Sequence, residues 1–436
     1  MTRDTASSAL APRGGRRTLL TGLLALALGT VPWAASAAAP QQPTARTASP
    51  QVILDWSETA VATVHTDAKR PVPEQLLWYG FVSAAVYNAV VGIEGRYTPY
   101  KWHERGPRGA SSEAAAAAAA HRVLLTYFPA SQARLDAALT ASLAKIPDGR
   151  AEDKGVAFGE RAAARIVQLR ENDGRGAPVT YDRPPAPGVW RPTLPANAPF
   201  AVPWLGQVRP MLLDSPDQFL PGAPPTLTSK AYTREFAEVK AVGARTGSTR
   251  TAQQTETARF FSDALPLQVQ AANRGYVERH GLGIVDAARL FAATGTAMAD
   301  ATITGWNAKF TYAQWRPITA IQLADTDGNP ATAADPSWLP LLDTPPYPDW
   351  VSGHNVNDGA VMSVLNRLTG GDIDFRISSA VTGTSRTYTS AADYNRDVID
   401  ARVWGGLHFR SSDVVANRTG GRIGSYALAH YFKPIK

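Results

Sequence analysis

The sequence contains no cysteine among its 436 residues. This absence excludes disulfide bonds, thiol catalysis and zinc sites built on thiolates. Beyond the first 37 residues, no stretch reaches the roughly 18 uninterrupted apolar residues that suggest a membrane-spanning helix. The formal net charge of +7 is mild, and no basic run with interleaved aromatic residues occurs. We therefore expect a soluble protein with a large core, no membrane span and no nucleic-acid partner.

The first 37 residues have the pattern of an export signal. The pair Arg16-Arg17 precedes an apolar run over residues 19–31, and residues 35–37 (Ala-Ser-Ala) offer a cleavage site. Paired arginines are typical of the twin-arginine route, which exports folded proteins, and a Sec signal with chance arginines is the alternative. The sequence therefore predicts a signal peptide over residues 1–37 and a secreted or extracytoplasmic mature protein.

Helical hydrophobic spacing dominates the rest of the chain. After an expected disordered linker at residues 38–50, apolar residues recur at three- and four-residue steps. Examples are the alanine-rich stretch at residues 114–120 and the long stripe over residues 284–310. Strand signals are few, and residues 372–389 predict a small β-hairpin. These patterns predict an all-α fold of two helical bundles.

A proline-rich segment, residues 174–225, separates two helical regions. Its prolines exclude long helices, while Trp190 and Phe200 argue against a free linker. We expect an ordered surface segment that could line a site entrance; disorder is the alternative. The sequence therefore predicts two regions. Residues 51–228 form an N-terminal helical region that includes the proline-rich segment, and residues 229–436 form a C-terminal helical bundle that carries the site.

The clearest candidate site begins where a proline-rich turn, residues 345–350, meets a helical pattern. The residues at this junction, 351–355, are Val-Ser-Gly-His-Asn, and Ser352 is predicted near the N-cap. A helix start offers free backbone N–H groups and the positive end of the dipole, which suit an oxyanion. Gly353 lets the backbone approach a ligand, and His354 projects from the first turn, where it can exchange a proton.

Two charged clusters flank this motif. Upstream, Lys309 lies on the long apolar stripe and Arg316 precedes a proline; downstream, Arg402 and His408 bracket a Gly-Gly pair that would end a helix. Taken singly, Lys309 could snorkel, Arg316 could end a helix and His408 could be a core histidine. Taken together with the central motif, they supply three cations, a hydroxyl, backbone donors and two imidazoles. This set suits a tetrahedral or trigonal-bipyramidal oxyanion such as phosphate or vanadate.

With these residues identified, the chain resembles the superfamily of vanadium-dependent haloperoxidases and type 2 phosphatidic acid phosphatases. The family pattern is Lys, six residues, Arg-Pro; then Pro-Ser-Gly-His; then Ser-Arg, five residues, His. The first part is complete at Lys309, Arg316 and Pro317. Val351 stands where the second part usually has proline, and Ala401 stands where the third part usually has serine.

The resemblance implies how the anion is held. Lys309, Arg316 and Arg402 would bind its oxygens, and Lys309 would also polarise a peroxide oxygen. The Ser352 hydroxyl and the Gly353 N–H would add hydrogen bonds. In a haloperoxidase this anion is a vanadate cofactor, whereas a phosphatase would bind the phosphate of its substrate and need no vanadate.

The resemblance also gives the two histidines their roles. His354 would be the acid/base, and His408 would be the apical vanadium ligand of a haloperoxidase or the nucleophile of a phosphatase. Many family members have an acid four residues after this second histidine; here Asp413 follows His408 by five. Asp413 could orient an imidazole or Arg402, and Asp300 is a second candidate for such a role.

Two features favour the haloperoxidase interpretation, both by resemblance. Trp306 matches a tryptophan near the halide site of chloroperoxidases, and the long helical N-terminal half resembles secreted bacterial haloperoxidases. Tyr347 lies seven residues before His354, where chloroperoxidases have Phe and algal bromoperoxidases have His; with Trp306 it is a candidate halide or substrate pocket. We therefore expect an enzyme that uses vanadate, hydrogen peroxide, halide and a small organic acceptor.

Two alternatives stay open on the sequence. The first is a secreted acid phosphatase that hydrolyses phosphate monoesters through a phosphohistidine. The second is a secreted binding protein for phosphate-like anions, although the presence of both His354 and His408 argues against it. The sequence also leaves open the halide, the organic acceptor and whether the chain forms a homodimer.

Overall fold

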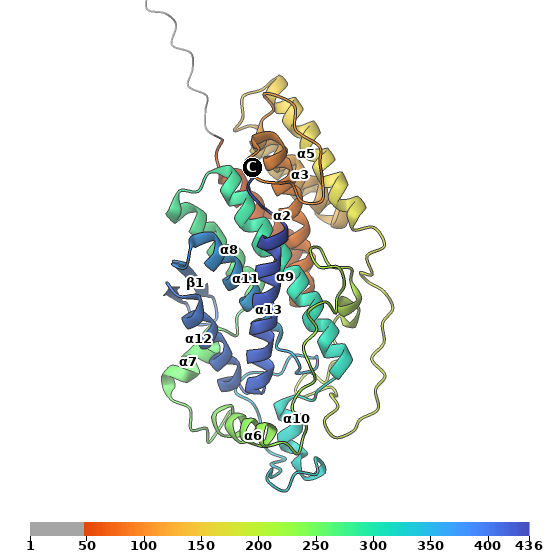
Figure 1. Cartoon of the computed structure of the whole chain (residues 1–436), viewed down its shortest axis with the longest axis vertical. Helices are drawn as coiled ribbons and strands as arrows, with labels where there is room; N and C mark the ends of the chain where they lie inside the picture. The colour runs from red at the N-terminus through yellow and green to blue at the C-terminus, as the bar shows by residue number, and fades with distance from the viewer. Residues whose placement is uncertain (1–47, 436) are drawn as a thin grey trace, which may run out of the picture. The chain divides into compact units, whose positions relative to one another are not determined.

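Helices form most of the regular structure in the computed structural model, which describes residues 48–435 (Figure 1). The predicted signal peptide, residues 1–37, and most of the predicted linker, residues 38–50, lie outside the described residues. The all-α prediction is confirmed for the part of the chain that the structure describes. The boundary between the N-terminal region and the C-terminal bundle, placed between residues 228 and 229, stays a prediction.

The N-terminal helices pack closely through alanine and glycine. These helices are α1 (Gln51–Val61), α2 (Val72–Glu94), α3 (Ser112–Tyr127), α4 (Gln132–Leu143) and α5 (Arg150–Leu169). The alanines at residues 114–120 of α3 are all buried, and α3 contacts both α2 and α5. A Cβ added at Gly159 of α5 would lie 2.2 Å from the carbonyl oxygen of Ala115 on α3. Small side chains therefore set the distance between these helices.

The C-terminal helices surround the predicted motif. They are α6 (Lys230–Val242), α7 (Ala252–Phe260), α8 (Leu265–His280), α9 (Ile284–Tyr312), α10 (Pro317–Gln322), α11 (Gly353–Thr369), α12 (Ala391–Trp404) and α13 (Arg410–His430). In Figure 1, α9, α11 and α13 lie side by side in the middle of the described chain, and they contact one another pairwise. A Cβ at Gly420 of α13 would lie 1.9 Å from the carbonyl oxygen of Val356, so α13 approaches α11 there at backbone distance.

Helix α2 is long and apolar enough to cross a membrane by length and composition, the one such helix among residues 48–435. Of its apolar window, 89% is buried inside the protein, where α2 packs against α3 and α9. That burial is the behaviour of a core helix.

The proline-rich segment is ordered, and part of it enters the core instead of staying on the surface. Its regular structure is a short 3₁₀ helix, Pro203–Gln207, which contacts α9, and Trp190 is only 1% exposed. The Asp300 carboxylate on α9 accepts three backbone hydrogen bonds, from Met211 at 2.6 Å and from the next two residues at 2.7 and 2.9 Å. Asp300 therefore anchors this segment, and the suggestion that it orients a site residue is wrong.

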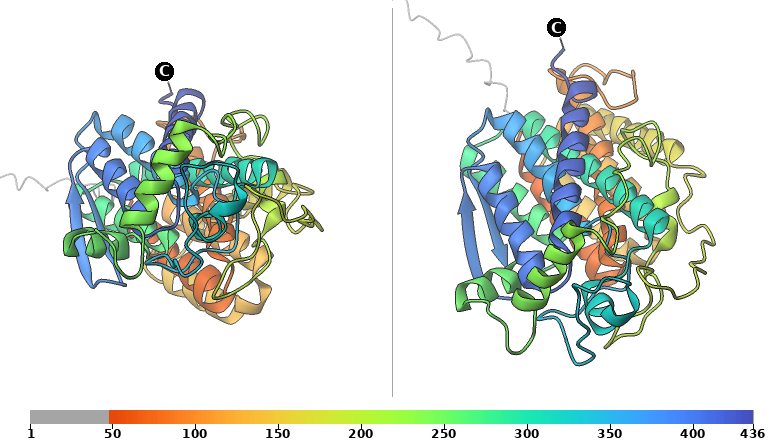
Figure 2. Two further views of the ribbon diagram at one scale, coloured as in Figure 1. Left: turned by 90° about the horizontal axis from the view of Figure 1, so that it is seen from below. Right: turned by 60° about the horizontal axis from the view of Figure 1, so that its bottom comes forward.

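A two-stranded antiparallel hairpin completes the fold. Strands β1 (Phe375–Ser379) and β2 (Thr384–Tyr388) pair with Phe375 opposite Tyr388, within the predicted stretch 372–389. β1 contacts α8 and β2 contacts α12, and the hairpin is visible at one edge of both views in Figure 2. The hairpin thus covers the outer side of α12, whose C-terminal end reaches the site.

Candidate active site

The three sequence clusters come together where four helices begin or end. Lys309 lies in the last turn of α9, and Arg316 is the N-cap of α10. Ser352 is the N-cap of α11, as predicted, with its side chain accepting from the Asn355 N–H at 3.5 Å. Arg402 lies in the last turn of α12. After Arg402, the C-cap residue Gly405 and then Gly406, with φ +74°, turn the chain, so that the loop to α13 presents His408.

The turn before α11 supplies carbonyl oxygens to two of the cations. Lys309 Nζ donates to Pro348 O at 2.8 Å and to Asp349 O at 3.1 Å, and Arg316 Nε donates to Tyr347 O at 2.7 Å. Both Lys309 and Arg316 are 0% exposed. Lys309 therefore does not snorkel, and its partners are backbone carbonyls, which satisfy donors without neutralising the charge.

His408 lies between Arg316 and a carboxylate that the motif search missed. Arg316 Nη1 is 3.0 Å from His408 Nε2 and also donates to Leu407 O at 2.8 Å. On the other side of the ring, Asp349 Oδ1 is 2.7 Å from His408 Nδ1. The same oxygen is 3.8 Å from Arg316 Nη1, and the Asp349 side chain is fully buried. Asp349 belongs to the predicted turn but to none of the three motif patterns.

Asp413 contacts the start of α11 and not an imidazole. Its Oδ1 accepts a hydrogen bond from Asn355 Nδ2 at 2.8 Å, and the Asn355 N–H donates to the side chain of the N-cap residue, Ser352. Asp413 therefore holds the N-terminus of α11 in place. The sequence offered an imidazole or Arg402 as the group that Asp413 orients; the hydrogen bond goes to Asn355 instead, while the charge of Asp413 acts on Arg402 and raises its pKa against the effect of burial.

Several buried polar atoms at this site have no hydrogen-bond partner among the described residues. They include Arg316 Nη2, Arg402 Nε, His354 Nε2 and both carboxylate oxygens of Asp349. Buried polar atoms are normally paired, so such a group of unpaired donors and acceptors needs an explanation. The first turn of α11 adds backbone N–H groups that no helical carbonyl can satisfy. Guanidinium donors, a helix N-terminus and imidazole nitrogens together fit a multiply charged oxyanion such as vanadate or phosphate.

Burial and mutual repulsion shift the titration of the cationic groups. Burial, followed by the charge of Arg316, lowers the pKa of Lys309 well below its usual range. Burial likewise lowers the pKa of His408, helped by Arg316 and Lys309, and that of His354, helped by Arg402. Both imidazoles are therefore neutral near pH 7, and each keeps one nitrogen lone pair to accept a proton or bind a ligand.

Burial acts in the opposite sense on the carboxyl groups. It raises the pKa of Asp349 to about 7 against the lowering charges of Arg316 and Lys309, and it raises the pKa of Asp413 well above its usual range. Asp358, on α11, also has its pKa raised by burial to about 7, although Tyr394 donates a hydrogen bond of 2.7 Å to it. Three buried acids thus accompany three buried cations.

The two predicted pocket aromatics form one wall of the site. The rings of Trp306 and Tyr347 are 4.9 Å apart between centroids, and Lys309 Nζ lies 5.6 Å and 5.0 Å from them. Trp306 Nε1 donates to Ala201 O of the proline-rich segment at 3.2 Å. A Cβ on Gly353 would lie 3.2 Å from the Trp306 ring, so glycine allows the start of α11 to pack on it.

A cavity of about 590 Å³ reaches one edge of the site, at Tyr347. His354 and Arg402 line it together with Tyr347, and prolines at residues 71, 73, 345 and 346 contribute much of the remaining wall. His354 is half-buried, yet its Nε2 is buried, so the ring extends from the cavity into the site. Ala201 of the proline-rich segment also lines the cavity, as predicted for a site entrance.

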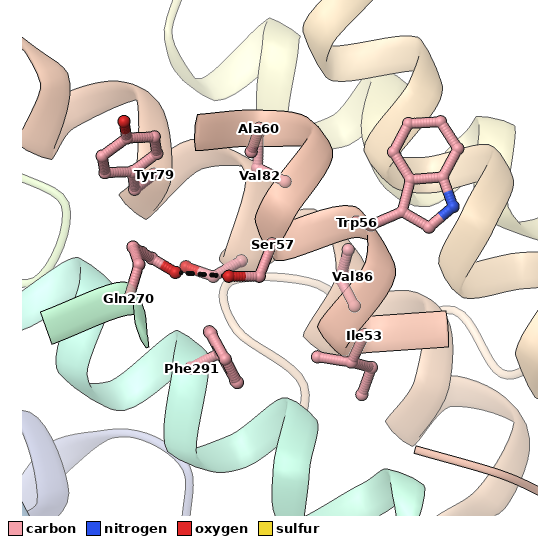
Figure 3. Close-up of a pocket in the computed structure, with 10 residues that line it drawn as sticks. Ile53, Trp56, Ser57, Ala60, Tyr79, Val82, Val86, Gln270 and Phe291 are labelled. Atoms are coloured by element: carbon pink, nitrogen blue, oxygen red, sulfur yellow. Dashed lines mark hydrogen bonds between the residues drawn. The ribbon is translucent and has the colours of Figure 1, made fainter. Parts of the chain in front are cut away.

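A second cavity lies among α1, α2, α8 and α9 and contains none of the site residues (Figure 3). Its volume is about 30 Å³, and Ser57 donates to Gln270 there at 2.8 Å. This space holds about one water molecule, so it is a packing cavity rather than a substrate site.

Comparison with known proteins places these features in a family. Residues 289–436 match the family model of the VCPO second helical-bundle domain. The vanadium chloroperoxidase of Curvularia inaequalis is 26% identical over 335 residues, covering 62% of this chain. The chain spans about half of that enzyme, 54% of its length.

Two solved structures share the fold. A bacterial vanadium-dependent iodoperoxidase superposes with a TM-score of 0.74 at 23% identity, covering 90% of this chain and 99% of that one. A bacterial vanadium-dependent chloroperoxidase in its holo form superposes with a TM-score of 0.66 at 20% identity, covering 82% of this chain and 91% of that one. The three motif clusters lie within the matched residues 289–436, and these findings are consistent with the superfamily of vanadium-dependent haloperoxidases and type 2 phosphatidic acid phosphatases, whose fold the chain shares.

Proposed function

We propose that the protein is a vanadate-dependent haloperoxidase that oxidises a halide with hydrogen peroxide. The observation that carries the proposal is the group of buried polar atoms without partners on Arg316, Arg402 and His354, beside the imidazole of His408. A site with this inventory would bind a tetrahedral oxyanion and would offer it one imidazole nitrogen as a ligand. The relatives that match in sequence and fold are named as haloperoxidases, which favours vanadate over a phosphate ester.

The cations and the helix start would hold the cofactor. Lys309, Arg316 and Arg402 would neutralise its oxygens, and the Ser352 hydroxyl and Gly353 N–H would fix its orientation. A bound anion would favour the charged form of Lys309, whose pKa is otherwise lowered by burial and by Arg316. When bound, vanadate supplies the centre at which peroxide is activated toward halide.

The two histidines would have different roles, His408 as a ligand of the cofactor and His354 as the group that exchanges a proton. His408 would present Nε2 as the ligand atom, because its Nδ1 faces the carboxylate of Asp349. His354 reaches the site from the cavity side, and its neutral imidazole would take a proton from the incoming peroxide and return it later. The wall made by Trp306 and Tyr347 would exclude water beside Lys309 and leave an apolar, polarisable place for a halide.

One assay of the purified mature protein tests this function. Peroxide-dependent oxidation of iodide, bromide and chloride is measured with and without added orthovanadate, in parallel with hydrolysis of a phosphate monoester. We expect vanadate to switch on halide oxidation, with iodide as the easiest substrate. Ester hydrolysis that vanadate only inhibits, without halide oxidation at any pH, would support the phosphatase alternative, since vanadate mimics the transition state of phosphoryl transfer.

We also propose that the mature protein is exported by the twin-arginine route. The proposal rests on Arg16-Arg17, the apolar run and the Ala-Ser-Ala sequence at residues 35–37. Expression with the intact N-terminus should give an extracytoplasmic protein beginning at residue 38. Replacing both arginines by lysine should trap it inside the cell, and continued export of that variant would point to the Sec route.

A further inference from the structure

Asp349 is the least explained charged group in the protein's interior. Its backbone is held from three sides: its N–H donates to Gln314 O at 2.9 Å, and its carbonyl oxygen accepts from Lys309 Nζ and from Ser412 Oγ at 3.0 Å. Its carboxylate is 0% exposed, and neither oxygen has a hydrogen bond of regular geometry among the described residues. Burying a carboxylate in this way is costly, so its position calls for a function.

The nearest polar atom to this carboxylate is the imidazole of His408. Oδ1 lies 2.7 Å from Nδ1, although the N–H direction is not aligned with it as in a regular hydrogen bond. Two other groups approach Nδ1, Arg316 Nη1 at 3.3 Å and Ser412 Oγ at 3.4 Å. The guanidinium can only donate, and the Ser412 proton is directed to Asp349 O. Asp349 Oδ1 is therefore the closest acceptor for a proton on Nδ1, and Ser412 Oγ, whose own proton is directed to Asp349 O, is a second acceptor farther away.

The opposite nitrogen of the ring has the complementary environment. Arg316 Nη1 is closer to Nε2, at 3.0 Å, than to Nδ1. A guanidinium beside Nε2 favours a lone pair there, and a carboxylate beside Nδ1 favours a proton there. Both neighbours thus favour the same neutral tautomer, with Nδ1 protonated and the Nε2 lone pair facing Arg316 Nη1.

We propose that Asp349 is a positioning residue that holds His408 in the Nδ1-protonated tautomer, with Nε2 directed at the bound oxyanion. The other buried acids near the site have different partners: Asp413 accepts from Asn355, and Asp358 accepts from Tyr394. The i+4 position in the first turn of α13 is Ser412, so the acid that orients His408 comes from the turn before α11. The inference rests on the proposed function only for the identity of the anion.

The tautomer can be measured directly in the wild-type protein without any anion. Long-range ¹H–¹⁵N correlation spectra of protein labelled at histidine distinguish the two neutral tautomers, and the His408 signals are identified by their loss in His408→Ala. We expect His408 to be neutral and protonated on Nδ1. A spectrum in which His408 carries its proton on Nε2 would overturn the proposal, whether or not any variant folds.

Anion binding gives a second, independent readout. Orthovanadate and inorganic phosphate are titrated calorimetrically into the wild type, Asp349→Asn, Asp349→Ala and the control Asp358→Asn. Loss of such an orienting partner typically weakens metal binding about 10–100-fold, so we expect Asp349→Ala to fall in this range for vanadate. Asp349→Asn keeps an acceptor without the charge and should lose less, while Asp358→Asn should bind within about threefold of the wild type.

The outcomes separate this inference from the proposed function. Wild-type protein that binds neither anion would contradict the proposed function, and the tautomer of His408 would still decide the role of Asp349. Vanadate affinity in folded Asp349→Ala equal to that of the wild type would show that Asp349 does not position His408. If Asp358→Asn lost as much vanadate affinity as Asp349→Ala, the proposal would also be contradicted, because the effect would then follow from replacing any buried acid.

Discussion

The protein contains two buried clusters of charge, and they differ in how their hydrogen bonds are used. In the N-terminal half, Arg170 Nε donates to Asp173 at 2.8 Å, and Arg175 Nε donates to the same carboxylate at 2.7 Å. Arg170 also donates to the carbonyl oxygens of Arg209 and Pro210. None of these three side chains leaves a buried polar atom without a partner. We refer to Arg170, Asp173 and Arg175 as the structural cluster.

The site cluster, made of Lys309, Arg316, Asp349, Arg402 and His408, is buried throughout, whereas Arg175 of the structural cluster is partly exposed; yet it is the site cluster that is incompletely paired. Arg316 Nη2, Arg402 Nε and both oxygens of Asp349 lack hydrogen-bond partners among the described residues. Charge and burial alone therefore do not distinguish a functional site from a structural one. Unpaired buried atoms occur elsewhere too, as at Arg191 Nε, but in the site cluster several charged groups with unpaired atoms lie together, and their donors remain available to a ligand.

The largest expected effect comes from removing His408, the proposed vanadium ligand. His408→Ala should lower peroxide-dependent halide oxidation by at least about 10³-fold and greatly weaken vanadate binding, since no second imidazole lies in that place. Steady-state rates with saturating vanadate measure the first effect, and calorimetry measures the second. Vanadate affinity unchanged from the wild type would mean that the ligand lies elsewhere.

Replacing one arginine in each cluster should separate stability from binding. Arg170→Met leaves the Asp173 carboxylate with one partner fewer in the interior, and we expect it to lower the free energy of unfolding by about 3–5 kcal/mol. Arg316→Met removes a cation from a group of repelling cations, so its stability loss should be smaller while vanadate binding falls by at least about 10²-fold. Urea titrations and calorimetry on both variants test the contrast, and the opposite pattern would reverse the assignment of the clusters.

The buried acid Asp358 should make stability depend on pH in a defined direction. Its pKa is about 7 in the folded protein, against about 3.9 for an unfolded aspartate. Between these values the folded state holds a proton that the unfolded state has lost, so the free energy of unfolding falls as pH rises from about 4 to 7. Asp358→Asn should remove this part of the slope, by up to a few kcal/mol. The free energy of unfolding is measured by urea titration at several pH values. The same dependence on pH in the wild type and in Asp358→Asn would contradict a buried, protonated Asp358.

The smallest expected effect is that of the Tyr347 hydroxyl. Its backbone oxygen binds Arg316 and its ring faces Lys309, and both contacts survive in Tyr347→Phe. We therefore expect kcat/KM for each halide to change less than about tenfold, with vanadate affinity unaltered. Tyr347→Ala, which removes the ring, serves as the comparison and should reduce halide oxidation more strongly.

Most of the fold could be predicted because its helices are long and strongly periodic. The stripe over residues 284–310 became α9, and Ser352 caps α11 as its position before Gly353 predicts. Helix α10 was missed because six residues span fewer than two turns and show no periodicity. The burial of the proline-rich segment was missed because it depends on Asp300, whose three backbone partners are far away in the sequence.

The cations and histidines of the site could be found from motif spacing, whereas their acidic partners could not. Asp349 directly follows Pro348 in a turn with three prolines and looks like an ordinary turn residue, and nothing in its spacing shows that the turn folds against His408. Asp413 was noticed, but its partner is set by the rotation of α13 against α11 and not by its distance from His408 in the sequence. A buried acid close to a Ser-Gly-His motif is the signal that could have drawn attention to Asp349.

The most direct test of the account is a calorimetric titration of orthovanadate into the wild type, Arg316→Met and Arg170→Met under identical conditions. If unused donors mark the site, the wild type binds one vanadate per chain, phosphate competes for it, Arg316→Met loses the binding, and folded Arg170→Met keeps it. Binding that is absent from the wild type, or that Arg170→Met loses as completely as Arg316→Met, would contradict the claim that the unpaired cluster is the site.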